Sequence, residues 1–144
     1  KELYTHKTYN RERVLLSYLH LCNDGGLQFL GKNTRALFKG VKTIKGYEGR
    51  MLKLTESSQS NGSLMRIMPI VYLFQNHTKQ HVIEFALIDT KLTNPCEVNC
   101  EATYIYVTLF YNILNPSMTT IDICKDLWRK DVNSSIFVIQ LNKR

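Results

Sequence analysis

The segment 95–114 is the longest apolar stretch of the chain, and it limits the possible folds more than any other feature. It is hydrophobic nearly all round, which is typical of a helix buried on most sides. Its β-branched and aromatic residues also permit a strand, but its length and its well-marked start favour a helix. Asn94 would be the N-cap, with Pro95 at N1 and Glu97 at N3, close to a capping box. The sequence therefore predicts an all-α fold, an orthogonal helical bundle around this central helix.

Helical spacing of apolar residues recurs along the rest of the chain. A helix is expected over 10–22, capped by Asn10, and a short one after Gly31, capped by Asn33 or Thr34. Further helices are expected around Tyr47 and Met51, over 63–75 with a kink at Pro69, over 79–92, and over 119–131. The β-prone stretch 135–141 could be a helix end, an edge strand or part of an irregular tail over 132–144.

The length of 144 residues predicts a single domain over 1–144. With 44% hydrophobic residues the chain can form a packed core. No run reaches the roughly 18 apolar residues of a transmembrane helix, and no secretory signal pattern is visible. A cytoplasmic, intracellular location is therefore expected, with no membrane partner.

Cysteine and histidine spacing gives no support for a metal site. The four cysteines form no C-x-x-C pair, so free buried thiols are expected at Cys22, Cys96, Cys100 and Cys124. Cys96 and Cys100 would share a helix face but have no third ligand nearby. His77 and His81 are four residues apart, but Thr78 stands where a zinc-protease motif has glutamate.

Positive charge is concentrated in one part of the chain. The net charge is +7, and the segment 32–53 has seven basic residues against Glu48 alone, a net charge of +6. Such a segment attracts anions, including nucleic acid, acidic lipid or a phosphate ligand. A solvated helix face with no binding role explains the same pattern.

The segment 57–69 carries the clearest functional signal. A polar loop ends at Asn61-Gly62 and leads directly into an apolar helix that begins near Ser63. Gly62 permits a positive φ or the close approach of a ligand, and Asn61 and Ser63 can cap the helix. Free amides at a helix N-terminus bind phosphate well. The alternative is a turn that only initiates a helix.

Three sequence blocks, in the same order and spacing, resemble the ADP-ribosylglycohydrolase family (the dinitrogenase-reductase-activating glycohydrolase type). The central block is Asn-Gly-Ser-Leu-Met-Arg-x-x-Pro, which begins at Asn61. Gly31 to Arg35 is similar to the family's glycine-then-threonine helix start. The block Leu92-Thr93-Asn94-Pro95 resembles a segment that usually has His in place of Asn94. The likeness covers about residues 10–115 and implies the central part of the family's all-α domain.

The resemblance implies which residues would contact an ADP-ribosyl group. The 60–63 loop would hold the diphosphate and ribose, and Thr93 and Asn94 would lie near the adenosine. Asn94 could instead be only a helix cap, and Arg66 could brace the loop or a buried carbonyl rather than touch ligand. The expected ligand-binding residues are Gly31, Asn33, Thr34, Ser60, Asn61, Gly62, Ser63, Arg66, Thr93 and Asn94.

Magnesium is expected from the family, but its ligands are not found in this chain. Active members hold two magnesium ions with Thr-Asp-Asp-Thr and Asp-x-Asp-Thr motifs, and neither occurs here. Asp122 and Asp126 are more typical of a solvated helix face. No catalytic residue is assigned, so the chain is expected to be inactive alone. It could be a truncated reading frame, a fragment, or a reduced member of the type found in large DNA viruses.

Three functions remain open at this point. The chain could be a hydrolase of ADP-ribosylated substrates that takes metal ligands from elsewhere. It could bind ADP-ribose or a nucleotide without cleaving it. It could be a basic protein that binds nucleic acid or a protein partner through 32–53. Helices cut from a larger bundle would leave apolar faces exposed, so self-association is also expected.

Overall fold

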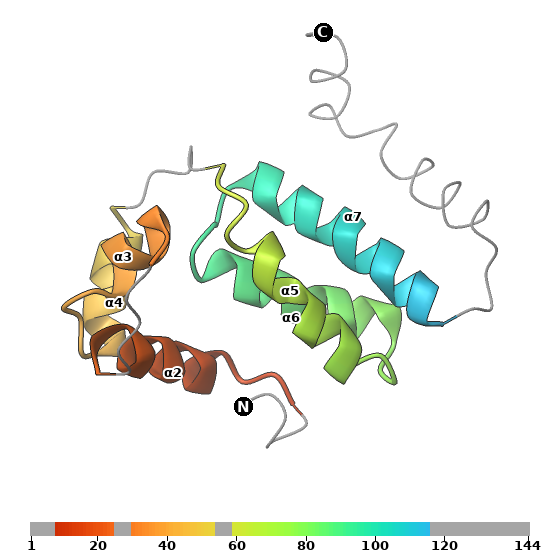
Figure 1. Cartoon of the computed structure of the whole chain (residues 1–144), viewed down its shortest axis with the longest axis horizontal. Helices are drawn as coiled ribbons and strands as arrows, with labels where there is room; N and C mark the ends of the chain where they lie inside the picture. Colours follow the sequence, from red (N-terminus) through yellow and green to blue (C-terminus); the bar gives the residue numbers. More distant parts are fainter. Residues whose placement is uncertain (1–7, 25–29, 54–58, 116–144) are drawn as a thin grey trace, which may run out of the picture.

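The computed structural model describes residues 8–24, 30–53 and 59–115, and every regular element in these ranges is a helix (Figure 1). The helices are α2 (Arg11–Asn23), α3 (Lys32–Phe38), α4 (Ile44–Met51), α5 (Leu64–Leu73), α6 (Lys79–Lys91) and α7 (Glu97–Leu114). The predicted all-α fold is confirmed, and the segment that also permitted a strand is the helix α7.

Helices α2, α3 and α4 pack together around one hydrophobic cluster. Asn10 caps α2 as predicted, because its side chain accepts a hydrogen bond from the Arg13 amide at 3.0 Å. Phe38 lies at the centre of the cluster, with its ring stacked on Tyr18 and Tyr47 at centroid distances of 5.2 and 5.1 Å. The buried members are Leu15, Leu19, Leu37, Phe38, Val41, Tyr47 and Leu92.

Helices α5, α6 and α7 form the second group, shown in green to blue in Figure 1. Thr78 caps α6 through its hydroxyl, and Pro69 lies inside α5 as predicted. The hydroxyl of Tyr111 on α7 donates to the His77 carbonyl at 2.7 Å, which ties α7 to the turn between α5 and α6. The buried apolar cluster consists of Ile67, Ile70, Val71, Phe74, Val82, Ile83, Ala86 and Val107.

The segment that follows α6 joins the two groups. Leu92 belongs to the α2–α4 cluster, and its carbonyl accepts a hydrogen bond from the Tyr47 hydroxyl at 2.9 Å. The residues before α2 also contact the second group, because the Tyr9 ring stacks on the Phe85 ring of α6 at a centroid distance of 5.9 Å. The contacts of Leu92 place the turn between α6 and α7 against the α2–α4 cluster.

The predicted helix caps Asn94, Asn33 and Thr34 are wrong, and the side chains of Asn94 and Asn33 bond to other segments of the chain. Asn94 does not cap α7, which begins at Glu97 after Cys96, and the amide of Asn94 is bonded to Ser60 instead. Asn33 and Thr34 lie inside α3, whose N-cap position is Gly31. Position in the sequence alone was therefore a poor guide to the caps. The side-chain amides of Asn33 and Asn94 bond to distant residues instead of capping a helix.

The start of α5 also differs from the expectation. Ser63 occupies the N-cap position, but its backbone is helical and its side chain makes no capping hydrogen bond. Asn61 contributes its backbone carbonyl, which accepts from the Met65 amide at 3.3 Å. Gly62 does not have a positive φ; among the described glycines only Gly40 does.

Several expectations lie outside the described residues: the helix over 119–131, the tail over 132–144, the 135–141 stretch, and the roles of Cys124, Asp122 and Asp126. The single domain over 1–144 and self-association stay predictions. Cys22, Cys96 and Cys100 are free thiols. Within the three described ranges, no helix has both the length and the apolar character needed to cross a membrane.

Candidate functional site

A continuous chain of hydrogen bonds connects the three sequence blocks that were predicted to form the site. The Asn33 amide on α3 donates to the Thr93 carbonyl at 2.9 Å. The Thr93 hydroxyl donates to Asn94 Oδ1 at 2.7 Å. The Asn94 amide then donates to the Ser60 carbonyl and hydroxyl at 3.0 and 2.8 Å. Asn33, Thr93 and Asn94 are all buried, so the chain forms the inner support of the 60–63 loop.

Arg66 supports the same loop from its other end. Its Nη1 donates to the Gly62 carbonyl at 3.2 Å. Its Nε and Nη2 donate to the carboxylate and the main-chain carbonyl of Asp89, at 2.6 and 2.7 Å. The guanidinium also lies over the Tyr18 ring, 5.6 Å from its centroid. All of these contacts of Arg66 are with the protein itself, which is the arrangement expected of a residue that braces the loop.

The 60–63 loop presents its first three residues to solvent and buries the fourth. Ser60, Asn61 and Gly62 are exposed, whereas Ser63 is 0% exposed. In the described part of the chain the Ser63 hydroxyl has no hydrogen-bond partner, which is costly for a buried group. The loop leads into the N-terminus of the ten-residue helix α5, the positive end of the helix dipole, which favours anions.

Burial and the charges of the Arg66–Asp89 pair set the pKa values of Tyr9 and Tyr18. The Tyr9 hydroxyl donates to Asp89 Oδ1 at 3.1 Å. Burial, and then the Asp89 carboxylate, raise the pKa of Tyr9 far above its usual range. Burial also raises the pKa of Tyr18 to about 12, although Arg66 opposes the shift. Both tyrosines therefore stay protonated at neutral pH, and Tyr9 remains a hydrogen-bond donor to Asp89.

The structure brings together some of the predicted site residues and leaves two apart. Asn33, Ser60, Thr93 and Asn94 share one hydrogen-bond chain, and Gly62 and Arg66 are directly bonded. Gly31 and Thr34 lie on either side of Asn33 at the start of α3, and in the ranges that the structure describes neither is hydrogen-bonded to the loop. Asn61 is exposed at the centre of the loop.

Sequence reasoning missed the part played by Asp89, Tyr9 and Tyr18. In the structure Asp89 is buried, whereas its neighbour Ile88 is exposed. Arg66 and Asp89 are 23 residues apart in sequence and on different helices, so no local pattern could pair them. The available signal was a carboxylate on the same face of α6 as the apolar residues Val82 and Ala86, since a buried carboxylate needs a cationic partner.

The described residues offer hydrogen-bond donors for an anion but no free acid or base at the loop. Both oxygens of Asp89 are occupied, one by Arg66 and the other by Tyr9. Burial raises the pKa of the Cys22 and Cys100 thiols, which disfavours a reactive thiolate. In residues 8–24, 30–53 and 59–115, no three His, Cys, Asp or Glu side chains gather where they could hold a metal.

Comparison with known protein families identifies one family for this chain. Residues 2–136 match the family described as ADP-ribosylglycohydrolase. No curated protein and no solved structure gave a significant match. Because the family match covers nearly the whole sequence, this chain belongs to the ADP-ribosylglycohydrolase family.

Proposed function

We propose that this chain binds the ADP-ribosyl group of an ADP-ribosylated molecule at the 60–63 loop. The family acts on ADP-ribosylated substrates, which supports this kind of partner. The observation that carries the proposal is that a solvent-exposed loop is held from inside at two points. Asn94 holds Ser60, and Arg66 holds the Gly62 carbonyl. A loop fixed in this way keeps its shape without a ligand, which lowers the entropic cost of binding.

The chemistry of the loop suits the diphosphate and a neighbouring ribose. The N-terminal end of α5 favours negative charge, and the Asn61 amide can donate to a phosphate or hydroxyl oxygen. Gly62 adds no side chain above the loop, so a ligand can approach the backbone closely. We assign Thr93 and Asn94 a positioning role, because their polar atoms already bond one another and Ser60.

The family is metal-dependent, but the described residues do not fit a metal centre. Asp89 is their one buried carboxylate, and Arg66 and Tyr9 already occupy it. Magnesium would need several free oxygen ligands in nearly octahedral geometry. We therefore derive no hydrolytic step, and hydrolysis stays dependent on carboxylates contributed by other residues or by another chain.

Calorimetric titration of ADP-ribose into the purified chain tests the proposal. The test variant is Asn61→Asp combined with Gly62→Val, which places negative charge and bulk on the exposed loop. A Cβ at Gly62 would lie 3.8 Å from Asn94 Oδ1 and from Ser60 Oγ, so the extra methyl groups of valine fill the remaining space. Asn76→Asp is the matched control, since it adds the same charge at an exposed residue in the turn between α5 and α6.

We expect saturable binding to the native chain and to Asn76→Asp, and at least a tenfold loss in the loop variant. Repeating the titration with magnesium asks whether a metal site lies outside the described residues. Enhanced binding together with release of ADP-ribose from a modified protein would support a complete hydrolase. Absence of binding under both conditions would overturn the proposal and leave the loop with a purely structural role.

A further inference from the structure

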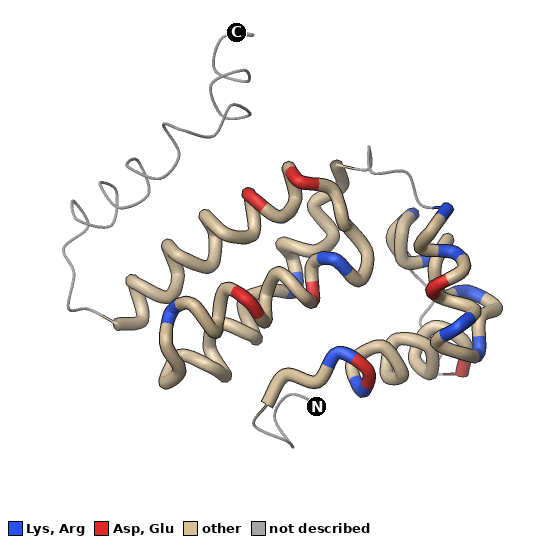
Figure 2. The backbone as a smooth tube through the Cα atoms, turned by 180° about the vertical axis from the view of Figure 1, so that it is seen from behind, with Lys and Arg blue, Asp and Glu red and all other residues tan. Residues whose placement is uncertain are grey.

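Within the described ranges, the net excess of positive charge lies in one segment, 30–53. The segment 30–53, which forms α3 and α4, has seven basic residues and one acidic residue. The segment 8–24 is neutral, and 59–115 has three basic and four acidic residues. Figure 2 shows the blue Lys and Arg positions gathered over α3 and α4, with red positions mostly on the other helices.

Six of these seven basic side chains are exposed. We name them the basic end: Lys32, Arg35, Lys39, Lys42, Lys45 and Lys53. None of them forms an ion pair with an acidic residue of the described ranges. Arg50 is the seventh basic residue and is not part of the basic end. It donates to the Ala36 and Lys39 carbonyls and thereby ties α4 to the end of α3. The basic end is therefore a surface whose charges are available to an anionic partner.

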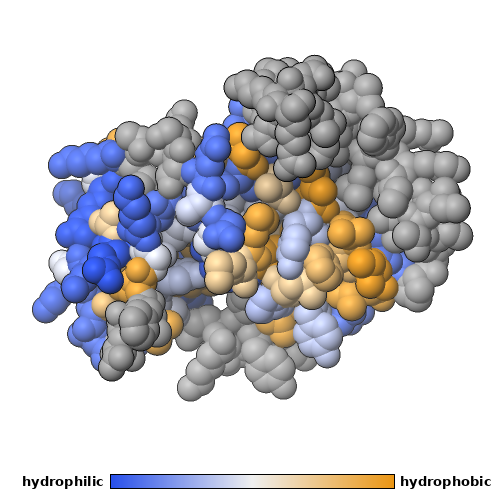
Figure 3. Space-filling view, turned by 45° about the horizontal axis from the view of Figure 1, so that its top comes forward, coloured by the Kyte–Doolittle hydropathy of each residue, from blue (hydrophilic) through white to orange (hydrophobic). Residues whose placement is uncertain are grey.

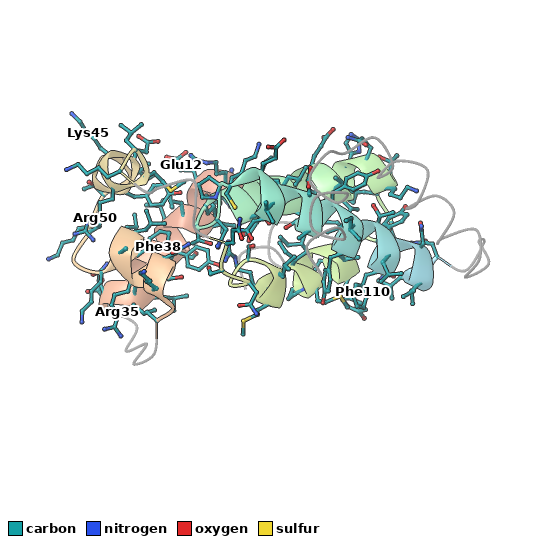
Figure 4. All side chains as sticks on the ribbon, turned by 90° about the horizontal axis from the view of Figure 1, so that it is seen from above. Glu12, Arg35, Phe38, Lys45, Arg50 and Phe110 are labelled. Atoms are coloured by element: carbon teal, nitrogen blue, oxygen red, sulfur yellow. The ribbon has the colours of Figure 1, made fainter. Side chains whose placement is uncertain are left out.

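Figure 4 shows Arg35 and Lys45 pointing outward from this end, while Phe38 lies between the helices. The two aromatic residues of the segment, Phe38 and Tyr47, are both buried. The basic end thus offers cations without an exposed ring on which a base could stack. Contacts of this kind address phosphates and carry no sequence information.

Most of the exposed large apolar residues in the described ranges lie outside the segment 30–53, and Figure 3 shows broad orange areas on the side of α5–α7. Within the segment 30–53, Leu52 is the only large apolar side chain that is exposed. A helix that lies on a membrane needs an apolar face to insert into it, and the apolar side chains of α3 and α4 are turned into the α2–α4 cluster. A membrane surface is therefore the poorer partner.

We propose that the basic end binds the phosphodiester backbone of a nucleic acid, without preference for base sequence. This surface is distinct from the 60–63 loop and does not depend on the proposed ADP-ribose binding. Binding should weaken steeply as salt rises, because each phosphate contact releases counterions. Affinity should be similar for duplexes of different sequence.

Fluorescence anisotropy with a short labelled DNA duplex, measured over a series of salt concentrations, tests this proposal. The test variant combines Lys42→Glu with Lys45→Glu in the basic end. The matched control combines Lys79→Glu with Lys91→Glu at the two ends of α6, which changes the net charge by the same amount. Vesicles of phosphatidylcholine with and without phosphatidylserine serve as the membrane probe.

We expect the basic-end variant to lose at least tenfold in affinity, and the slope of log affinity against log salt to fall by about two. The α6 control should keep most of its affinity. Equal losses in both variants would show that only net charge matters and would overturn the proposal, as would binding to acidic vesicles but not to DNA. Both variants should bind ADP-ribose like the native chain, so failure here is separable from failure at the loop.

Discussion

Arg66 on α5 bonds to both the side chain and the main chain of Asp89 on α6, with donor–acceptor distances of 2.6 and 2.7 Å. The Asp89 side chain is 5% exposed and that of Arg66 is 22% exposed, so the pair is largely withdrawn from water. The same guanidinium reaches the Gly62 carbonyl. One side chain thus links helix packing to the position of the loop that we propose binds ADP-ribose.

Replacing Arg66 by methionine should destabilise the protein by about 3–5 kcal/mol, because the buried Asp89 carboxylate would lose its cationic partner. Replacing Asp89 by leucine as well should recover part of this loss, since no charge then remains buried. Urea unfolding followed by far-UV circular dichroism measures the free energies of unfolding of the native chain, of the single variants Arg66→Met and Asp89→Leu, and of the double variant. Arg13→Met, at an exposed position on α2, is the control and should change the stability by less than about 0.5 kcal/mol. If the losses of stability in the two single variants added up to the loss in the double variant, Arg66 and Asp89 would not be energetically coupled.

Replacing Asn94 by aspartate should loosen the 60–63 loop. The substitution keeps the shape but puts an oxygen where the amide now donates to the Ser60 carbonyl at 3.0 Å. We expect a loss of about 1–3 kcal/mol in stability, as for a buried acceptor that loses its donor. ADP-ribose affinity should fall as well.

Urea unfolding and calorimetry measure the two effects of Asn94→Asp. Asn76→Asp is again the exposed control and should match the native chain in both. Unchanged stability in Asn94→Asp would show that the hydrogen-bond chain does not support the loop. Lower stability with unchanged ADP-ribose affinity would contradict the link between the support and binding.

Local patterns predicted the helices well, because apolar spacing records which face of each helix is buried. Asn10 was correctly identified as a cap, since its side chain bonds to the backbone amide of Arg13, only three residues away. Asn33 and Asn94 were wrongly identified, since their amides bond to residues 60 and 34 positions away. The Arg66–Asp89 pair likewise joins residues that are far apart in the sequence and lie on different helices. Sequence therefore located the candidate site through its family blocks, while its supporting contacts depend on packing between helices.

Two glycines, Gly40 in the turn after α3 and Gly49 inside α4, should respond in opposite directions to substitution by alanine. Gly40 has a φ of 75°, so Gly40→Ala should cost about 1 kcal/mol or more through backbone strain. Gly49 lies inside α4, and a Cβ there would meet nothing within 4 Å. Gly49→Ala should therefore stabilise the protein by about 0.5–1 kcal/mol. Thermal unfolding of the two variants should show melting temperatures on opposite sides of the native value, and shifts of the same sign would contradict the backbone geometry.

Tyr47 should make the protein sensitive to alkaline pH. Burial raises its pKa from 10.0 to about 12, and its hydroxyl donates to the Leu92 carbonyl. Because the folded state holds this proton more tightly, the stabilisation is complete below pH 10 and is lost as the pH rises towards 12. The free energy of unfolding should fall by up to about 1.4 kcal/mol per pH unit in that window for this one group.

Urea unfolding at a series of pH values between 9 and 12 measures this dependence, with the window set by the Tyr47 pKa. Tyr47→Phe should be less stable at neutral pH, because the Leu92 carbonyl loses its donor, and its stability should decline less steeply above pH 10. Tyr72→Phe is the control, because Tyr72 is 62% exposed and its ring packs against no core cluster. If both variants declined as steeply as the native chain, the titration of Tyr47 would not be coupled to unfolding.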